Sequence, residues 1–179
     1  MLRTCMPLAL AAAVAAGCAA MGAMDGSNGG AGAVATLEPT KGNSVRGTVT
    51  FTQSGHKVQV TAMVTGLKPN AEHGFHVHEK GDCSSADAMS AAGHFNPAGK
   101  PHGNVHAGGE RHAGDLPNLK ADASGNASTS FEAMGISVGG GAADIVGRGL
   151  IVHRDPDDYK SQPAGNAGAR LACAAIARR

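Results

Sequence analysis

Two neighbouring segments alternate between inward apolar residues and outward residues that are mostly polar: VRGTVTFT at 45–52 and KVQVTAMV at 57–64. Val45, Gly47, Val49 and Phe51 share one face of the first segment, and Arg46 and the threonines share the other. A period of two with β-branched residues is typical of half-buried antiparallel strands. The residues QSGH at 53–56 suit a short hairpin connection. The pair therefore predicts an antiparallel β-sheet with one face in the core.

Further short strands are predicted at 74–78, 119–123, 127–133, 149–153 and 169–176, with Gly, Pro and Asn turns nearby. No stretch keeps a helical period. Two segments, 79–117 and 154–168, fit no strand, and loops of that length are usually functional. The sequence predicts an all-β fold, an antiparallel β-sandwich or flattened barrel of about eight strands with two long loops.

Residues 1–18 resemble a secretory signal, with Arg3 before an apolar run and small residues at its end. The run is rich in Ala and Gly, which favour membrane insertion far less than Leu or Ile, so a signal is preferred to a membrane span. AAGC at 15–18 is similar to a bacterial lipobox, although Ala15 stands where Leu is usual. A lipid on Cys18 would anchor the protein to a membrane, and ordinary cleavage nearby is the alternative. The expected location is the periplasm.

Residues 19–33 are rich in Ala and Gly and predict a flexible linker, and residues 34–179 have the size of a single domain. The net charge is +1 and the chain has no basic run, so no nucleic-acid partner is expected. Cys83 and Cys173 are the cysteines of the predicted domain. Because an exported chain meets an oxidising compartment, a disulfide between them is expected, and a metal-ligand role for one cysteine is the alternative.

The histidines carry the clearest chemistry of the chain. All nine lie between positions 56 and 153, and six of them, with one aspartate, can be interpreted as one metal site: His76, His78, His94, His102, His112, Asp115 and His153. Neutral imidazole is the commonest metal ligand, and a histidine-rich site suits copper or zinc. In FHVH at 75–78 the alternation places both histidines on the face opposite Phe75 and Val77, close enough to hold one ion.

Two ligand sets can be drawn from these residues. Three histidines with one carboxylate match a closed zinc site, whereas three or four histidines open to solvent match a redox copper site. His153 ends an apolar strand that can lie beside 75–78, and His94 opens the long loop that also contains His102, His112 and Asp115. His94 would belong to both sets, as an imidazolate bridge between the two ions.

Five segments in order along the chain resemble the copper/zinc superoxide dismutases: GFHVHE at 74–79, GHFNP at 93–97, RHAGDL at 111–116, GRGLIVH at 147–153 and RLAC at 170–173. GDC at 81–83 and DPDDY at 155–159 are similar to the bacterial periplasmic branch. The resemblance implies a Greek-key β-sandwich, an architecture that this family is known to have. It also implies an oxidoreductase that converts superoxide to dioxygen and hydrogen peroxide, an antioxidant defence of the cell envelope.

By that resemblance, copper is held by His76, His78, His94 and His153, and zinc by His94, His102, His112 and Asp115. Asp157 matches the carboxylate that links a copper histidine to a zinc histidine, with Asp155 and Asp158 as competitors. Arg170 matches the arginine beside copper that attracts the superoxide anion. Arg170 and His94 are thus the expected catalytic residues.

Several alternatives stay open at this level. His106 could displace a neighbouring histidine as a zinc ligand, whereas His56 and His73 are interpreted as surface or strand-edge residues. A non-catalytic periplasmic copper-binding protein could share the fold, but it would be expected to lack a ligand or Arg170. The sequence leaves both a monomer and a homodimer open.

Overall fold

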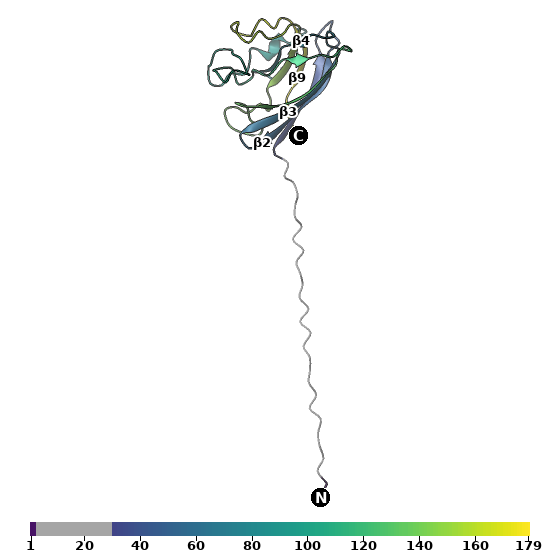
Figure 1. The fold of residues 1–179 in the computed structure, drawn as a ribbon, viewed down its shortest axis with the longest axis vertical. Helices are drawn as coiled ribbons and strands as arrows, with labels where there is room; N and C mark the ends of the chain where they lie inside the picture. The colour runs from purple at the N-terminus through teal and green to yellow at the C-terminus, as the bar shows by residue number, and fades with distance from the viewer. Residues whose placement is uncertain (3–29) are drawn as a thin grey trace.

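The computed structural model describes residues 1–2 and 30–179 (Figure 1). Most of the predicted signal and linker, including Cys18, lies outside the described residues. The regular secondary structure of the described domain consists of β-strands and one 3-10 turn, η1 (Met89–Ala91). In chain order the strands are β1 (Gly32–Pro39), β2 (Arg46–Ser54), β3 (Lys57–Thr65), β4 (Glu72–His73), β5 (Phe75–His78), β6 (Leu119–Lys120), β7 (Ala127–Ala133), β8 (Gly149–His153), β9 (Arg170–Ala175) and β10 (Ala177–Arg178).

Every pairing between these strands is antiparallel, and eight of the strands form one curled sheet. The order is β5-β8-β9-β1-β2-β3-β7, with β10 beside β1, while β4 and β6 form a separate pair. Strand β1 joins the two halves of the sheet, because its first part pairs with β2 and its last two residues pair with β9. Figure 1 shows the strands curled on one side of the domain and the long loops gathered on the other. The predicted all-β antiparallel fold is confirmed.

Burial follows the predicted alternation in β2 and β3. Val49 and Phe51 are fully buried, whereas Arg46 is exposed. In β3 the valines and Ala62 are buried, and Met63 points outward with 61% of its surface exposed. Because each strand presents alternate residues to the core, the sheet is amphipathic and curls around its apolar face.

The first strand of the structure was not predicted from the sequence. β1 starts at Gly32, inside the segment 19–33 that was predicted to be a flexible linker. Its inward residues Ala33, Ala35 and Leu37 are buried. Alanine at two of these inward positions gives a weak alternation signal, so the strand was missed.

The predicted strand at 119–123 is shortened to β6, which ends at Lys120. The Asp122 side chain accepts hydrogen bonds from the backbone N–H groups of Ser124 and Asn126, at 2.8 and 2.9 Å. Such local bonds compete with strand pairing and turn the chain toward β7.

The predicted disulfide between Cys83 and Cys173 is present and spans a sequence separation of 90. It ties the long loop to β9, beside a second apolar cluster formed by Ala88, Ala91, Ile151 and Cys173. Ile151 and Cys173 are register partners on β8 and β9, so the loop packs directly onto the sheet. Closing a loop of this length constrains the unfolded chain by about 4–5 kcal/mol in the chain-entropy model.

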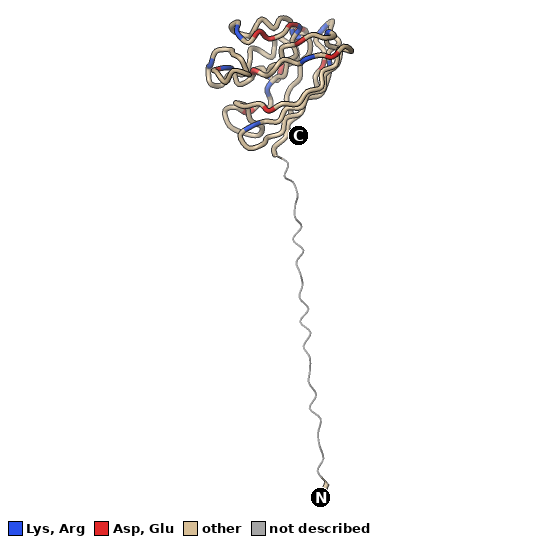
Figure 2. The backbone as a smooth tube through the Cα atoms, viewed as in Figure 1, with Lys and Arg blue, Asp and Glu red and all other residues tan. Residues whose placement is uncertain are grey.

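Charged residues of both signs are spread along the loops and strand ends of the described domain (Figure 2). This mixture agrees with the net charge of +1 for the whole chain. Within the part of the chain that the structure describes, there is no helix long and apolar enough to cross a membrane.

Candidate metal centre

The base of the site is the antiparallel pair β5 and β8, in which Phe75 pairs with Val152 and His76 with Ile151. Phe75 and Val77 enter the core, as their alternation predicts. His76 and His78 therefore project from the opposite side of β5, where the loops cover them so completely that both are buried.

The long loop is bound to β5 by its backbone. Val77 donates its N–H to the carbonyl of Gly114 at 2.9 Å and accepts the N–H of Phe95 at 2.8 Å. Isolated bridges pair His76 with Asp115 and His78 with His94. A side chain at position 114 would collide with the Val77 carbonyl, so glycine permits this close approach.

The histidine and aspartate side chains gather into two groups that share one member. The first group contains His76, His78, His94 and His153. The second contains His94, His102, His112 and Asp115. Within each group the nearest ligand atoms all lie within 4.8 Å of one another. The shared residue is His94, which the sequence singled out as a bridge between two ions.

Hydrogen bonds determine which ring nitrogen each histidine of the first group leaves free. His78 Nδ1 lies 2.9 Å from the Ala92 carbonyl, and His153 Nδ1 lies 3.2 Å from the Gly168 carbonyl. A carbonyl can only accept, so both Nδ1 atoms carry the proton and both Nε2 atoms keep a lone pair. These two Nε2 atoms lie 3.4 Å apart and face each other.

Asp157 determines the tautomer of one histidine in each group. Its Oδ2 lies 2.8 Å from His76 Nε2, and its Oδ1 lies 3.0 Å from His102 Nε2. Hydrogen bonds from both rings hold the pKa of this buried carboxyl below its usual value, so the carboxylate is ionised and both Nε2 atoms donate. This leaves the Nδ1 of His76 free for a metal, whereas the Nδ1 of His102 faces Asp115 Oδ1 at 3.0 Å and is the atom that a metal would take. Neither Asp155, paired with Arg154, nor Asp158 takes this position.

The second group converges on one carboxylate oxygen. His94 Nδ1, His102 Nδ1 and His112 Nδ1 lie 2.8, 3.0 and 3.3 Å from Asp115 Oδ1. Asp115 Oδ2 accepts the backbone N–H groups of His112 and Gly103, which fixes the carboxylate. Three nitrogens and one oxygen around a single point match the preferred donor set of a tetrahedral zinc ion.

Three buried nitrogen atoms have no hydrogen-bond partner in the described structure: His73 Nε2, His76 Nδ1 and His94 Nε2. An unpaired buried polar atom is costly, so each such atom needs an explanation. His76 Nδ1 and His94 Nε2 belong to the four-histidine group, and a copper ion would satisfy both. A set of four imidazole nitrogens suits a transition metal such as copper.

Burial keeps three rings of the four-histidine group, those of His78, His94 and His153, ready to bind a cation. It lowers the pKa of His94 to about 4, against the partial opposition of the hydrogen bond to Asp115. Burial and the neighbouring His76 lower the pKa of His153 to about 3. The pKa of His78 is also lowered, mainly by burial. At neutral pH these rings are therefore unprotonated, the form that binds metal.

The second group has the opposite electrostatic character. Burial favours neutral Asp115, but hydrogen bonds from His102, His112 and His94 outweigh it and hold the pKa of Asp115 far below its usual range. Burial also lowers the pKa of His102, but the hydrogen bonds to Asp115 and Asp157 raise it to about 9. A metal that binds His102 must therefore displace a proton at neutral pH.

Arg170 lies at the mouth of a channel that leads to the four-histidine group. The channel has a volume of about 920 Å³, and His78, His94 and His153 line it together with Lys41 and Arg170. The Arg170 guanidinium donates to the carbonyls of Ala88 and Ala92, both at 2.6 Å. Burial lowers the pKa of Arg170 from its ordinary value, and the nearby Asp87 carboxylate partly opposes this, while a guanidinium stays protonated in proteins. Lys41 was not identified from the sequence, because it belongs to no motif.

The two carbonyls that hold Arg170 belong to residues with unusual backbone angles. Ala88 has φ 58° and ψ 18°, and Ala92 has φ 63° and ψ −152°. The second combination is almost restricted to glycine, because a Cβ clashes there. Ala92 is nevertheless held in place, since its carbonyl accepts hydrogen bonds from both His78 and Arg170.

The remaining histidines fall outside both groups. His106 is exposed and lies beside the Tyr159 ring, with centroids 5.6 Å apart. His56 is exposed, as expected. His73 is not a surface residue, which corrects that interpretation: it is 1% exposed, and its Nδ1 donates to the His153 carbonyl at 2.8 Å. The residues around His73 in the sequence do not indicate this contact, because its partner lies 80 residues away along the chain.

A β-sandwich with two histidine groups that share one imidazole defines a protein that binds copper and zinc. The family model described as copper/zinc superoxide dismutase (SODC) matches residues 45–176. The chain belongs to this family of oxidoreductases.

Relatives of the same kind come from a virus and a bacterium. The chain is 43% identical over 150 residues to the Cu-Zn superoxide dismutase of Paramecium bursaria Chlorella virus 1, covering 80% of this chain and 76% of that protein. It is 44% identical over 129 residues to Cu-Zn superoxide dismutase 2 of Aquifex aeolicus (strain VF5), covering 70% and 74%. A crystal structure of a double mutant of a SOD-like protein from Bacillus subtilis superposes with a TM-score of 0.73 at 38% identity, covering 80% of this chain and 96% of that one.

Replacing Ala92 by glycine should stabilise the protein. The substitution removes backbone strain of order 1–3 kcal/mol, and the extra entropy of glycine in the unfolded chain offsets about 0.5–1 kcal/mol of that gain. We expect a net increase of about 1 kcal/mol in the free energy of unfolding, measured by denaturant titration. Ala91→Gly is the matched control, because Ala91 is buried and has no positive φ, and it should be destabilising. If Ala92→Gly lowered the free energy of unfolding, the claim that the Ala92 backbone is strained would be wrong.

Zinc binding at pH 7 should release about one proton, which comes from His102 because its pKa of about 9 lies above the solution pH. Zinc affinity should therefore rise about tenfold per pH unit between 7 and 9 and level off above pH 9. Calorimetric titration in buffers of different ionisation enthalpy measures the proton count. Asp157→Asn removes one interaction that raises this pKa, and the variant should release fewer protons. Zinc binding without proton release at pH 7 would refute the assignment.

Proposed function

We propose that this chain converts two superoxide ions and two protons to dioxygen and hydrogen peroxide at a copper ion held by His76, His78, His94 and His153. Zinc is held by His94, His102, His112 and Asp115. The observation that carries the proposal is that His94 belongs to both groups, with Nε2 unpartnered on one side and Nδ1 at Asp115 on the other.

A copper ion held by the first group would supply one-electron redox chemistry, by alternating between Cu(II) and Cu(I). The protein supplies the donors, the proton and the approach of the anion. His94 lines the channel and its buried Nε2 has no partner in the described structure, so this nitrogen is the atom of the ring at which a proton could be exchanged.

Asp115 holds the opposite edge of the same ring, where a zinc ion would also bind. The Nδ1 of His94 points into the second group, so the ring stays in place when Nε2 exchanges its proton. Asp157 keeps the His76 and His102 rings oriented, as hydrogen-bonded carboxylates do at many metal sites. These contacts support a rigid site in which only a proton and an electron move.

Arg170 favours the approach of an anion. Its guanidinium is charged, points into the channel lining and is fixed by two carbonyls, so its position is preorganised. A cationic channel mouth raises the encounter rate of a small anion, and superoxide dismutase is a known example of this effect. A copper-binding protein without catalysis would have no use for such a group.

We further propose that the protein acts in the periplasm after export, with residues 1–18 as the signal. The support is the apolar run after Arg3 and the lipobox-like AAGC at 15–18. Lipidation of Cys18 would anchor the mature protein to a membrane, and ordinary cleavage would release it.

The intact mass of the native protein tests the export proposal. We expect a chain that lacks the first 17 residues and carries acyl groups on Cys18, or a chain cut nearby without lipid. Cys18→Ala should abolish the lipid mass in the first case. A cytoplasmic protein that retains Met1 would contradict export.

Replacing zinc by Co(II) beside Cu(II) tests the bridge. If one imidazole binds both ions, the two unpaired-electron systems should be magnetically coupled in electron paramagnetic resonance. The coupling should be lost in His94→Ala. Independent Cu(II) and Co(II) signals in the unmodified protein, at full occupancy of both sites, would rule the bridge out.

Arg170→Ala should lower the second-order rate constant for superoxide by about tenfold or more and flatten its dependence on ionic strength. Copper content should be unchanged, since a guanidinium is not a metal ligand. Arg170→Lys should retain part of the rate, because the charge remains while the planar fork is lost. Arg46→Ala is the matched control, as Arg46 is an exposed arginine on β2. Pulse radiolysis at equal copper loading gives the rates, and equal rates in all variants would refute steering.

A further inference from the structure

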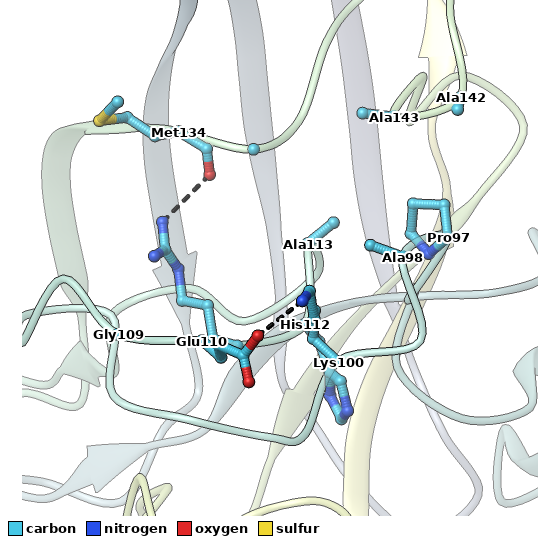
Figure 3. Close-up of a pocket in the computed structure, with 12 residues that line it drawn as sticks. Pro97, Ala98, Lys100, Gly109, Glu110, His112, Ala113, Met134, Ala142 and Ala143 are labelled. Atoms are coloured by element: carbon cyan, nitrogen blue, oxygen red, sulfur yellow. Dashed lines mark hydrogen bonds and ion pairs between the residues drawn. The ribbon is translucent and has the colours of Figure 1, made fainter.

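A second cavity opens onto the zinc group from the side of His112. Its volume is about 400 Å³, and His112 lines it together with Lys100, Glu110, Arg111, Met134 and Ala143 (Figure 3). Among the described residues, this cavity and the copper channel have no lining residue in common. The two metal groups therefore face solvent through separate openings.

His112 has the most exposed side chain of the proposed zinc group. Its side chain is 10% exposed, whereas those of His102 and Asp115 are fully buried and that of His94 is 2% exposed. A water molecule or chelator that displaces a protein ligand has to approach the zinc ion from solvent. The least protein lies in its way beside the least buried ligand side chain, which is that of His112. In this fold that path begins in the cavity beside His112.

Two interactions cross the wall of the cavity, and both are drawn in Figure 3. Lys100 pairs with Glu110 at 2.6 Å, and an Arg111 nitrogen donates to the Met134 carbonyl at 3.2 Å. The second contact joins the loop that carries His112 to the segment that follows β7. The ion pair is weak because both side chains are about half exposed or more, so it can open at little cost.

We infer that this cavity is the passage through which zinc enters and leaves, separate from the channel that serves copper and superoxide. The inference rests on the proposed zinc ligands. It predicts that changes at the cavity alter zinc exchange and leave copper exchange unaltered.

Two variants should change the rate of zinc release in opposite directions. Glu110→Gln breaks the ion pair and should speed release to a chelating dye by up to about fivefold. Ala143→Leu fills the cavity and should slow zinc release severalfold. If that variant does not fold, Ala98→Leu tests the same expectation from another lining position. Glu132→Gln is the matched control, because it breaks the exposed Lys57–Glu132 pair on the β3–β7 sheet and should change nothing.

The measurement follows release of zinc and copper from the fully loaded, intact protein with separate chromogenic chelators. Raising the salt concentration should speed zinc release in the unmodified protein but not in Glu110→Gln. Unchanged zinc rates in the cavity variants would overturn the passage, as would copper rates that change in parallel with zinc. Failure of the proposed function would look different: the unmodified protein would not hold one zinc per chain, or His112→Ala would hold it equally well.

Discussion

The Asp157 carboxylate is the contact on which the metal centre depends, because it orients one imidazole of each metal group at the same time. It is itself fixed by the backbone N–H of Tyr159 at 2.6 Å, while Asn118 brackets the backbone of Asp157 with two further hydrogen bonds. Gly165 covers it, and a Cβ there would collide with the carboxylate. The second long loop therefore acts as a template that selects the tautomers of two buried rings.

The β-sheet supplies the fixed side of this arrangement. His76, His78 and His153 project from adjacent strands whose other faces fill the core, so their positions are set by the same packing that stabilises the fold. The first loop is held down by the disulfide, by the cluster around Ile151 and by Arg170. The strained backbone of Ala92 persists because His78 of β5 and Arg170 of β9 both bind its carbonyl, and η1 ends directly before it. Arg170 and His78 are both oriented by the one carbonyl of Ala92.

Sequence reasoning predicted the parts of the molecule in which local pattern and final environment agree. The alternation of β2 and β3 follows from their own residues, and the His-x-His pair of β5 follows from strand geometry. The β1 strand was missed because alanine fills two of its inward positions, and β6 was predicted too long because Asp122 turns the chain. His73 was misplaced at the surface, since its partner is a backbone carbonyl 80 residues away. Contacts made across loops, such as Lys41 beside the copper channel, have no local signature.

The central claim is that hydrogen bonds select which nitrogen of His76, His78, His102 and His153 is offered to a metal. Long-range nitrogen-15 NMR of the reduced, diamagnetic copper and zinc form reads these tautomers directly. We predict that His76 and His102 carry their proton on Nε2, and that His78 and His153 carry it on Nδ1. A proton on Nδ1 of His76 would contradict the account, because the nitrogen assigned to copper would then have no lone pair to offer.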